Sequence, residues 1–77
     1  IIMVVNLYKE FRNNVFSRHE SNQIKADRLW LQINHLIPEY DRNQFKIEWC
    51  HYRIGELSVD RFSSYFTEYV SKYFMGV

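Results

Sequence analysis

The sequence predicts an all-α fold, a small bundle of about four helices packed around a single core. Only two glycines and one proline occur in 77 residues, which leaves few places for the tight turns that join strands. Apolar side chains recur three and four residues apart along most of the chain, as they do on one face of a helix. The aromatic-rich C-terminal segment keeps this spacing and lacks the two-residue alternation of a strand.

The 77 residues are expected to form one helical domain over residues 1–77. The predicted helices cover residues 6–18, 22–37, 42–54 and 59–75. The apolar Ile-Ile-Met-Val-Val at residues 1–5 is too short for a signal-peptide core and lacks a basic flank. It is either a short extended segment or, in part, a foreign stretch ahead of Met3.

The first two predicted helices are defined by their apolar stripes. Asn6 is the candidate N-cap of the first helix. Its stripe consists of Leu7, Phe11, Val15 and Phe16. A connection at residues 19–22 follows, in which Ser21 is the candidate cap of the second helix. The stripe of this helix consists of Ala26, Leu29, Trp30, Ile33, Leu36 and Ile37. Pro38 is expected to end it, because proline lacks an amide donor and disfavours a helical conformation of the preceding residue.

The third predicted helix has two apolar sides. Asp41 and Gln44 have the spacing of a capping box that starts a helix at residue 42. One side carries Phe45, Trp49 and Tyr52, and the other carries Ile47, Cys50 and Ile54. So wide an apolar arc is typical of a central helix, so the thiol of Cys50 is expected to be buried. Gly55 can adopt the left-handed conformation that ends a helix.

The fourth predicted helix has the clearest pattern in the chain. Ser58 is its candidate N-cap, and Asp60 places negative charge in the first turn, where the helix dipole favours it. Seven large side chains then form a continuous seam: Phe62, Tyr65, Phe66, Tyr69, Val70, Tyr73 and Phe74. Gly76 is expected to close the helix.

Charge and motifs argue against several functions. The formal net charge is +1 with the two signs interspersed, so no strong field attracts nucleic acid or anionic lipid. No apolar run approaches the roughly 18 residues of a membrane span. Phosphate-binding loops and hydrolase motifs are absent. We therefore expect a protein without enzyme activity or cofactor. The single cysteine fits a reducing cytoplasm better than a secreted disulfide scaffold.

The histidines and the cysteine do not form a recognisable site. His19, His35 and His51 are sixteen residues apart, whereas zinc ligands come in pairs a few residues apart. Cys50 and His51 are adjacent, so on a helix they point about 100° apart and cannot act as nucleophile and base. No metal site and no catalytic residues are expected.

The aromatic content predicts a contact surface. The chain has fourteen Phe, Tyr and Trp residues, and a domain of this size buries only about 60% of the surface of its unfolded chain. Two interpretations of the last helix stay open, one with its rings in the core alone and one with its rings shared between core and interface. The candidate partner-binding residues are Tyr65, Tyr69, Tyr73, Trp49, Tyr52 and Trp30. The expected partner is another protein, a second copy of this chain, or both.

Residues 53–74, beginning Arg53-Ile54-Gly55-Glu56-Leu57-Ser58, resemble the C-terminal part of the Hha/YmoA family. Members of that family are small all-helical bacterial proteins that modulate gene expression by binding the nucleoid protein H-NS. The resemblance implies an alternative function as a nucleic-acid-associated modulator of gene expression. It covers under a third of the chain. Where the family has Asp-His-Arg, this sequence has His51-Tyr52-Arg53, and the first fifty residues align only with a sizeable insertion.

Direct DNA reading is the less favoured interpretation. The turn at residues 54–57 lies between two helices, but the helix after it is aromatic, whereas recognition helices offer Arg, Lys, Asn or Gln to base edges. The abundance of Ile, Asn, Tyr, Phe and Lys is typical of AT-rich genomes, and small aromatic-rich helical proteins are common among phage and plasmid products that disable host proteins. The sequence therefore predicts a regulator or inhibitor that binds a host or partner protein.

Overall fold

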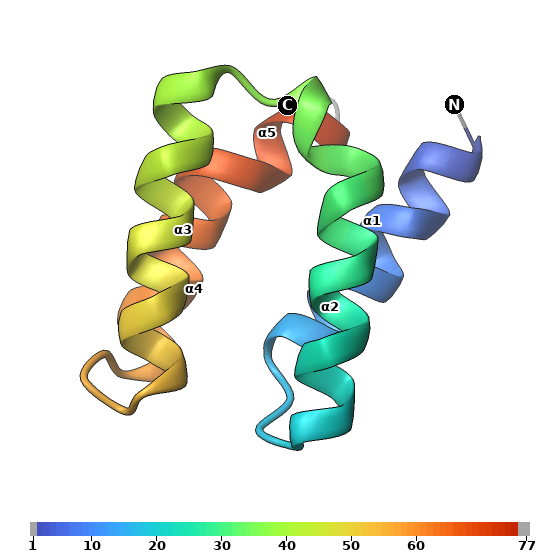
Figure 1. Ribbon diagram of the computed structural model, residues 1–77. Helices are drawn as coiled ribbons and strands as arrows, with labels where there is room; N and C mark the ends of the chain where they lie inside the picture. Colours follow the sequence, from blue (N-terminus) through green and yellow to red (C-terminus); the bar gives the residue numbers. More distant parts are fainter. Residues whose placement is uncertain (1, 76–77) are drawn as a thin grey trace. The chain divides into compact units, whose positions relative to one another are not determined.

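Every regular element in residues 2–75, which the computed structural model describes, is helical, and this confirms the predicted all-α class. The helices are α1 (Ile2–Val15), α2 (Glu20–Ile33), α3 (Glu39–Arg53), α4 (Val59–Phe66) and α5 (Lys72–Phe74). A 3₁₀ turn, η1 (Asn34–Leu36), follows α2, and a π-helical turn, η2 (Thr67–Ser71), joins α4 to α5 without a break. The chain divides into two compact units, Ile1–Leu36 and Ile37–Val77 (Figure 1). A single domain over residues 1–77 stays a prediction.

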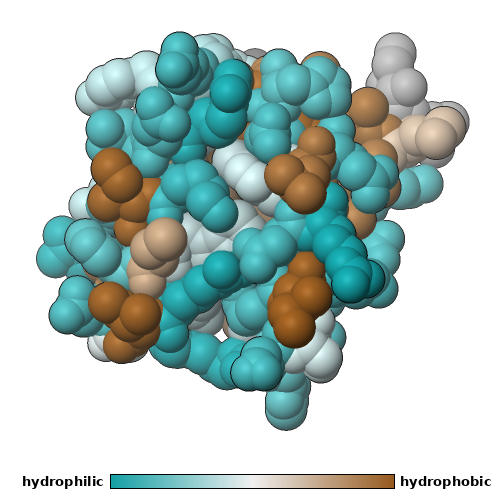
Figure 2. Space-filling view, in the orientation of Figure 1, coloured by the Kyte–Doolittle hydropathy of each residue, from teal (hydrophilic) through white to brown (hydrophobic). Residues whose placement is uncertain are grey.

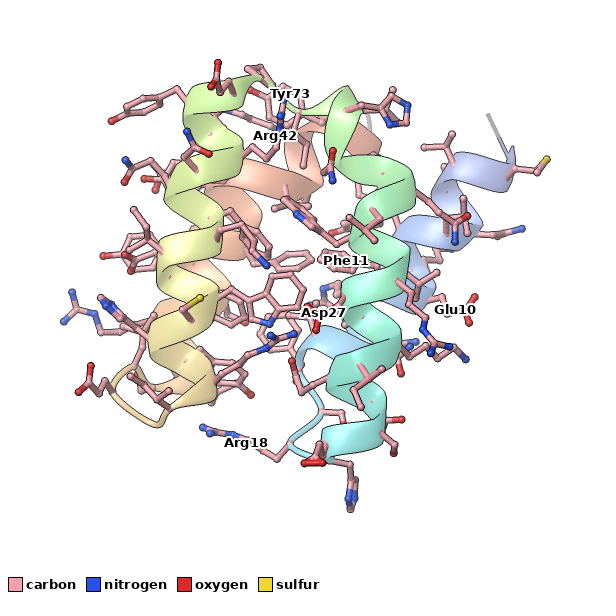
Figure 3. The ribbon with its side chains drawn as sticks, viewed as in Figure 1. Glu10, Phe11, Arg18, Asp27, Arg42 and Tyr73 are labelled. Carbon is pink, nitrogen blue, oxygen red and sulfur yellow. The ribbon has the colours of Figure 1, made fainter. Side chains whose placement is uncertain are left out.

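In unit 1, α1 begins earlier than the sequence analysis predicted. Residues 2–5 are helical, so the extended segment and the cap at Asn6 are both wrong. No glycine or proline interrupts residues 2–15, and nothing local therefore opposes the longer helix. Its buried side carries Tyr8, Phe11 and Val15. The Phe11 ring stacks on Trp30 of α2 with centroids 5.5 Å apart, and Figure 3 shows it pointing from α1 toward α2.

The end of α1 at Val15, three residues before its predicted end, is stabilised by Gln23. The side-chain amide of Gln23 donates hydrogen bonds to the backbone carbonyls of Asn14 (3.3 Å), Val15 (2.8 Å) and Ser17. The last carbonyls of a helix have no partner within it, and here a side chain from the first turn of α2 supplies one. One residue thus satisfies the end of α1 and holds it to the start of α2.

The start of α2 also differs from the prediction. The helix begins at Glu20, its N-cap is His19 without a side-chain capping bond, and Ser21 lies inside the first turn. The hydroxyl of Ser17 accepts hydrogen bonds from the backbone amide of His19 (3.3 Å) and from the side chain of Asn22 (2.8 Å). Glu20 adds negative charge at the helix N-terminus, where it is favourable. Ser17, four residues before the predicted cap Ser21, therefore orders the turn that leads into α2.

The apolar stripe predicted for α2 is correct except near its C-terminal end. Buried members of it are Ala26, Leu29, Trp30, Ile33 and Ile37. Leu36 is exposed. After Ile33 the chain tightens into η1, and a 3₁₀ turn of about three residues directs successive side chains differently from an α-turn of about 3.6. As predicted, the helical segment stops before Pro38.

In unit 2, α3 begins at Glu39 with Pro38 as its N-cap residue, so Asp41 is not the cap of a capping box. Proline suits a helix start because its fixed φ is compatible with the helix and its missing amide costs nothing there. The carbonyl of Pro38 accepts the first helical hydrogen bond, from the amide of Arg42 at 2.9 Å. Asp41 lies in the first turn of α3, and its carboxylate contacts Tyr73 and Lys72 of α5.

Only one side of α3 is covered. Phe45, Trp49 and Tyr52 are buried as predicted. Phe45 lies 5.6 Å from Phe62 and 5.4 Å from Phe66 between ring centroids, and Tyr52 stacks on Phe62 at 4.6 Å. The other apolar side, with Ile47, Cys50 and Ile54, is exposed. The predictions that α3 is central and that the Cys50 thiol is buried are therefore wrong, because α4, η2 and α5 pack against one side only.

The turn between α3 and α4 follows the prediction. Gly55 has φ +82°, the left-handed conformation expected of a residue that ends a helix. The Ser58 side chain caps α4 by accepting a hydrogen bond from the amide of Arg61 at 3.3 Å. Figure 1 shows that α3 and α4 run antiparallel on either side of this turn. The predicted closing residue, Gly76, lies outside the described residues.

Changing Gly55 to alanine is expected to lower the free energy of unfolding by about 1 kcal/mol, because a side chain disfavours positive φ. A Cβ atom at this position meets nothing within 4 Å, so the loss is conformational and not steric. Gly55→Asn is the control and should lose less, since asparagine tolerates this conformation. Urea denaturation followed by far-UV circular dichroism measures both. An alanine variant as stable as the parent would contradict this account of the turn.

The π-helical turn η2 keeps a row of buried side chains in line. In an α-helix each four-residue step overshoots a full turn by about 40°, because a turn holds 3.6 residues. The π turn, with hydrogen bonds to the fifth residue, holds more residues per turn and reverses this drift. All members of one four-residue row are therefore buried: Phe62, Phe66, Val70 and Phe74.

Candidate binding surface

The structure separates the fourteen aromatic rings into core and surface groups. Nine are buried: Tyr8, Phe11, Trp30, Phe45, Trp49, Tyr52, Phe62, Phe66 and Phe74. The other five are half-buried or exposed: Phe16, Tyr40, Tyr65, Tyr69 and Tyr73. Four of these five belong to unit 2, and all four are tyrosines. Any aromatic contact surface of unit 2 is therefore made of tyrosine.

Three of the predicted partner-binding residues lie in the core. Trp30 stacks on Phe11, and Tyr52 stacks on Phe62. Trp49 is fully buried, with its ring 5.5 Å from that of Phe45. These side chains are not available to a partner in this conformation. We therefore leave Trp30, Trp49 and Tyr52 out of the candidate surface.

Two cations cover the Trp49 ring. The ammonium of Lys46 lies 4.4 Å from the ring centroid, and the guanidinium carbon of Arg53 lies 4.3 Å from it. Both cations come from α3 itself, one turn before and one turn after the tryptophan. Cation–π attraction of this kind favours the packed ring over an outward-pointing one. Trp49, which the sequence analysis assigned to the contact surface, is thus a core residue.

The other three predicted residues form one row along the last helix. Tyr65, Tyr69 and Tyr73 lie four residues apart on α4, η2 and α5, and all three are half-buried. The rings of Tyr65 and Tyr69 are stacked almost parallel, at 5° with centroids 6.1 Å apart. Aromatic stacking orders both rings before any partner binds. None of the three tyrosines is fully buried, and their role in binding a partner stays a prediction.

A fourth tyrosine, which the sequence analysis missed, adjoins this row. Tyr40 is 70% exposed in the first turn of α3, and it is close enough to Tyr69 for its charge, when ionised, to contribute to the raised pKa of Tyr69 after burial and Glu68. It was missed because the capping box placed the start of the helix at residue 42 and left Tyr40 in a loop. We call Tyr40, Tyr65, Tyr69 and Tyr73 the tyrosine patch.

A polar cluster fixes one end of the tyrosine patch. The hydroxyl of Tyr73 donates a hydrogen bond to the Asp41 carboxylate at 2.5 Å, and the Lys72 ammonium lies 3.4 Å from the same oxygen. The guanidinium of Arg42 donates to the carbonyl of Ile37 at 3.1 and 3.3 Å. Figure 3 shows Arg42 and Tyr73 at the same end of unit 2. The two contacts to Asp41 tie the first turn of α3 to α5, and the Arg42 bonds tie it to the residue before Pro38.

The cluster changes the protonation of its members. The hydrogen bond to Asp41, with burial and the charge of Asp41, raises the pKa of Tyr73. Burial, followed by the charges of Glu68 and neighbouring groups, raises the pKa of Tyr69. For Lys72, partial desolvation lowers the pKa, but the hydrogen bond and charge of Asp41 outweigh it and the net shift is upward. The folded state therefore binds these protons more tightly than the unfolded chain does.

Stability is expected to decline at alkaline pH. A raised pKa in the folded state stabilises the fold below the ordinary pKa, which is 10.0 for tyrosine and 10.5 for lysine, and this contribution is lost as the pH rises through the folded value. Tyr73→Phe removes the bonded hydroxyl, so its stability at neutral pH should be lower and its alkaline decline shallower. Urea denaturation at several pH values above 9 measures the difference, with Tyr40→Phe, at a position 70% exposed, as the control. Equal alkaline slopes for Tyr73→Phe and the parent would contradict the role of this cluster.

The described residues contain no other candidate site. Within residues 2–75, no group of three or more His, Cys, Asp or Glu side chains is placed to hold a metal ion. The histidines His19, His35 and His51 are all exposed. None of the helices in this range is long and apolar enough to cross a membrane. The absence of a catalytic residue and of a cofactor stays a prediction.

The comparisons with known proteins leave the resemblance of residues 53–74 to the Hha/YmoA family as a prediction from the sequence. No protein-family model, no curated protein and no solved structure matches the chain.

Proposed function

We propose that this chain is a small non-enzymatic protein-binding module, a regulator or inhibitor that binds its partner through the tyrosine patch. The observation that supports this most strongly is the division of the aromatic rings of unit 2 between its core and its surface. The buried rings of unit 2 are Phe and Trp with one tyrosine, whereas its surface rings are all tyrosine. Tyrosine combines a large apolar ring with a polar hydroxyl and is enriched where one side of a residue is dry and the other wet.

The patch is also ordered in advance. Tyr65 and Tyr69 stack on each other, and the hydroxyl of Tyr73 is held by Asp41. Binding then costs little side-chain entropy, because the rings are already confined. A stable protein contact buries about 800 Å² on each partner, and a few central aromatic residues carry most of its energy. Four adjacent tyrosines supply such a centre.

The setting that we propose is the cytoplasm of a host cell. The single cysteine, Cys50, is exposed, and an exposed unpaired thiol suits a reducing compartment. The composition rich in Ile, Asn, Tyr, Phe and Lys supports a phage or plasmid origin, in which the partner is a host protein. Direct nucleic-acid binding receives no support from the net charge of +1.

Affinity capture from the native cell tests the proposal. The variant Tyr40→Ser, Tyr65→Ser, Tyr69→Ser alters the patch but keeps the bonded Tyr73. The control Ile24→Ser, Leu31→Ser alters two exposed apolar residues of α2. We expect the parent and the control to capture the same protein, and the patch variant to capture at least about tenfold less, which corresponds to a loss of about 1.4 kcal/mol.

Two outcomes would overturn the proposal. One is equal capture by the patch variant, provided that circular dichroism shows it to be folded. The other is capture that disappears steeply as salt rises from roughly 50 to 200 mM, which is the behaviour of nucleic-acid binding through phosphate contacts. An aromatic contact between proteins is expected to depend only weakly on salt over this range.

A further inference from the structure

Two carboxylates give the tyrosine patch a negative field at neutral pH. Glu68 is exposed in η2 beside Tyr69, and the carboxylate of Asp41 accepts the hydrogen bond of Tyr73. Burial is the largest cause of the raised pKa of Tyr69, and Glu68 and Asp41 are among the charges that raise it further. A cation in their place would lower this pKa. The surroundings of Tyr69 therefore favour positive charge.

The chain's own Lys72 shows how a cation is held at one end of the patch. Its ammonium lies 5.1 Å from the centroid of the Tyr73 ring and 3.4 Å from the carboxylate of Asp41. The face of an aromatic ring carries partial negative charge, so ring and carboxylate attract the same cation. One tyrosine and one acidic residue together thus bind one ammonium here.

The rest of the patch has the same components without a cation. In the part of the chain that the structure describes, no cation lies over the rings of Tyr40, Tyr65 or Tyr69. Glu68 makes no ion pair in this part either. The rings of Tyr65 and Tyr69 are parallel to within 5°, so a flat cation that stacks on one of them is parallel to both.

The two cations that neighbour Glu68 on this helical segment do not neutralise it. Lys72 follows it by four residues, but the ammonium lies beside Asp41. Arg61 precedes it by seven residues, about 10 Å along a helix, and the described chain shows no ion pair between them. Two carboxylates and one ammonium leave one negative charge at the middle of the patch.

The exposed apolar residues of α3 offer no comparable chemistry. Ile47 and Ile54 are 48% and 67% exposed. On the side of the molecule where α3 lies, Figure 2 shows hydrophobic side chains as separate groups among hydrophilic ones. Scattered apolar residues are ordinary on protein surfaces. The tyrosine patch, in contrast, combines ring faces with uncompensated negative charge, and this combination selects a ligand.

We propose that the tyrosine patch binds a positively charged side chain, arginine or lysine, on a segment of the partner protein. This inference rests on the proposed function and names the chemistry of the partner. The cation stacks on Tyr65 and Tyr69 and pairs with the carboxylate of Glu68. Arginine suits the site best, because its flat guanidinium stacks on rings while its in-plane N–H groups donate to a carboxylate.

The same charges disfavour a nucleic acid at this surface. Glu68 and Asp41 repel phosphate groups, whereas they attract a basic segment of a protein. The contact involves one cation held partly by ring faces, so its dependence on salt is weak beside that of a protein that neutralises many phosphates. The inference therefore agrees with the salt behaviour expected of the proposed function.

Selection from a displayed library of short random peptides tests the chemistry of the ligand. Peptides are selected on the full chain and counter-selected on the Tyr40→Ser, Tyr65→Ser, Tyr69→Ser variant. The retained peptides should contain Arg and Lys at least about twice as often as the library, because a cation gains both ring and carboxylate contacts. Retained peptides without this enrichment, or no peptide that distinguishes the two proteins, overturn the proposal.

Charge reversal at Glu68 tests the position of the cation. Binding of the tightest selected peptide, measured by fluorescence anisotropy, should weaken at least about tenfold in Glu68→Lys and about threefold in Glu68→Gln. Glu56→Lys makes the same charge change at an exposed position before α4 and should stay within about twofold of the parent. Equal weakening by Glu56→Lys overturns the proposal. If circular dichroism shows that Glu68→Lys is unfolded, unchanged binding by Glu68→Gln overturns it instead.

Replacement of the peptide's own cation tests the charge without altering the chain. Citrulline keeps the flat head of arginine and removes its charge, and acetyllysine does the same for the charge of lysine. Either replacement should weaken binding to the parent at least about fivefold, and should change binding to Glu68→Lys by less than about twofold. Equal affinity of the charged and uncharged peptides for the parent overturns the proposal.

The affinity capture described above separates this inference from the proposed function. Loss of the captured protein in the tyrosine variant, with full capture by Glu68→Lys, leaves the proposed function intact and overturns the cationic ligand. Loss in both variants, with full capture by Glu56→Lys, supports both. Full capture by the folded tyrosine variant overturns the proposed function and this inference with it.

Discussion

Replacing Phe62 with alanine is expected to remove about 3–5 kcal/mol from the free energy of unfolding, the largest effect of any single change considered. Phe62 is fully buried. Its ring lies 4.6 Å from that of Tyr52, 5.6 Å from Phe45 and 6.3 Å from Phe66 between centroids. The alanine variant therefore leaves a cavity among three rings that cannot close without moving α3 or α4. Small domains have only about 5–15 kcal/mol to lose.

Urea denaturation followed by tryptophan fluorescence reports on this loss, because the indole of Trp49, one of the two tryptophans of the chain, lies beside Phe45 in the same cluster. Phe62→Leu fills most of the space and should cost under about 2 kcal/mol. Val59→Ala, three residues earlier and exposed, should cost under about 0.5 kcal/mol. If Phe62→Ala were no less stable than Val59→Ala, the ring cluster would not be the core of unit 2.

Replacing Gln23 with alanine is expected to cost about 2 kcal/mol, the second-largest effect. The amide of Gln23 is the shared donor for the carbonyls of Asn14, Val15 and Ser17 at the end of α1. These contacts are partly buried, so the carbonyls lose a protein partner and gain water only in part. Part of the loss should appear as fraying of the last turn of α1.

Amide hydrogen exchange distinguishes this local effect from general destabilisation. In Gln23→Ala the amides of residues 12–17 should exchange faster than those in the middle of α2. Gln32→Ala, on an exposed position of the same helix, is the matched control and should leave exchange at residues 12–17 unchanged. Uniform acceleration over both helices would mean that Gln23 does not act as a clamp on α1.

The helices were predictable, but most of their starts were not. Apolar spacing located all four helical segments, and Gly55 and Ser58 were identified because each acts through its own local conformation. Asn6, Ser21 and Asp41 were taken as caps from their residue type alone. Each is inside a helix, because helix starts also depend on groups distant in sequence, such as the Ser17 hydroxyl before α2.

The candidate surface was predictable in part. Tyr65, Tyr69 and Tyr73 share a face by spacing alone, and the structure confirms that none of them is fully buried. Spacing could not show which of the two apolar sides of α3 is covered, so Trp49 was assigned to a surface and Cys50 to the core. The side chains packed against each, and hence their burial, depend on tertiary contacts that a local pattern does not contain.

The most direct test of the central claim is hydroxyl-radical footprinting of the free protein, read residue by residue by mass spectrometry. If the surface rings of unit 2 are tyrosines, Tyr40 should be oxidised fastest, Tyr65 and Tyr69 at intermediate rates, and Tyr8 and Tyr52 slowest, in the order of their exposure. Addition of the captured partner should then protect Tyr40, Tyr65 and Tyr69. Oxidation of Tyr65 and Tyr69 as slow as that of Tyr52 in the free protein would contradict the claim, because no aromatic surface would then be open to a partner.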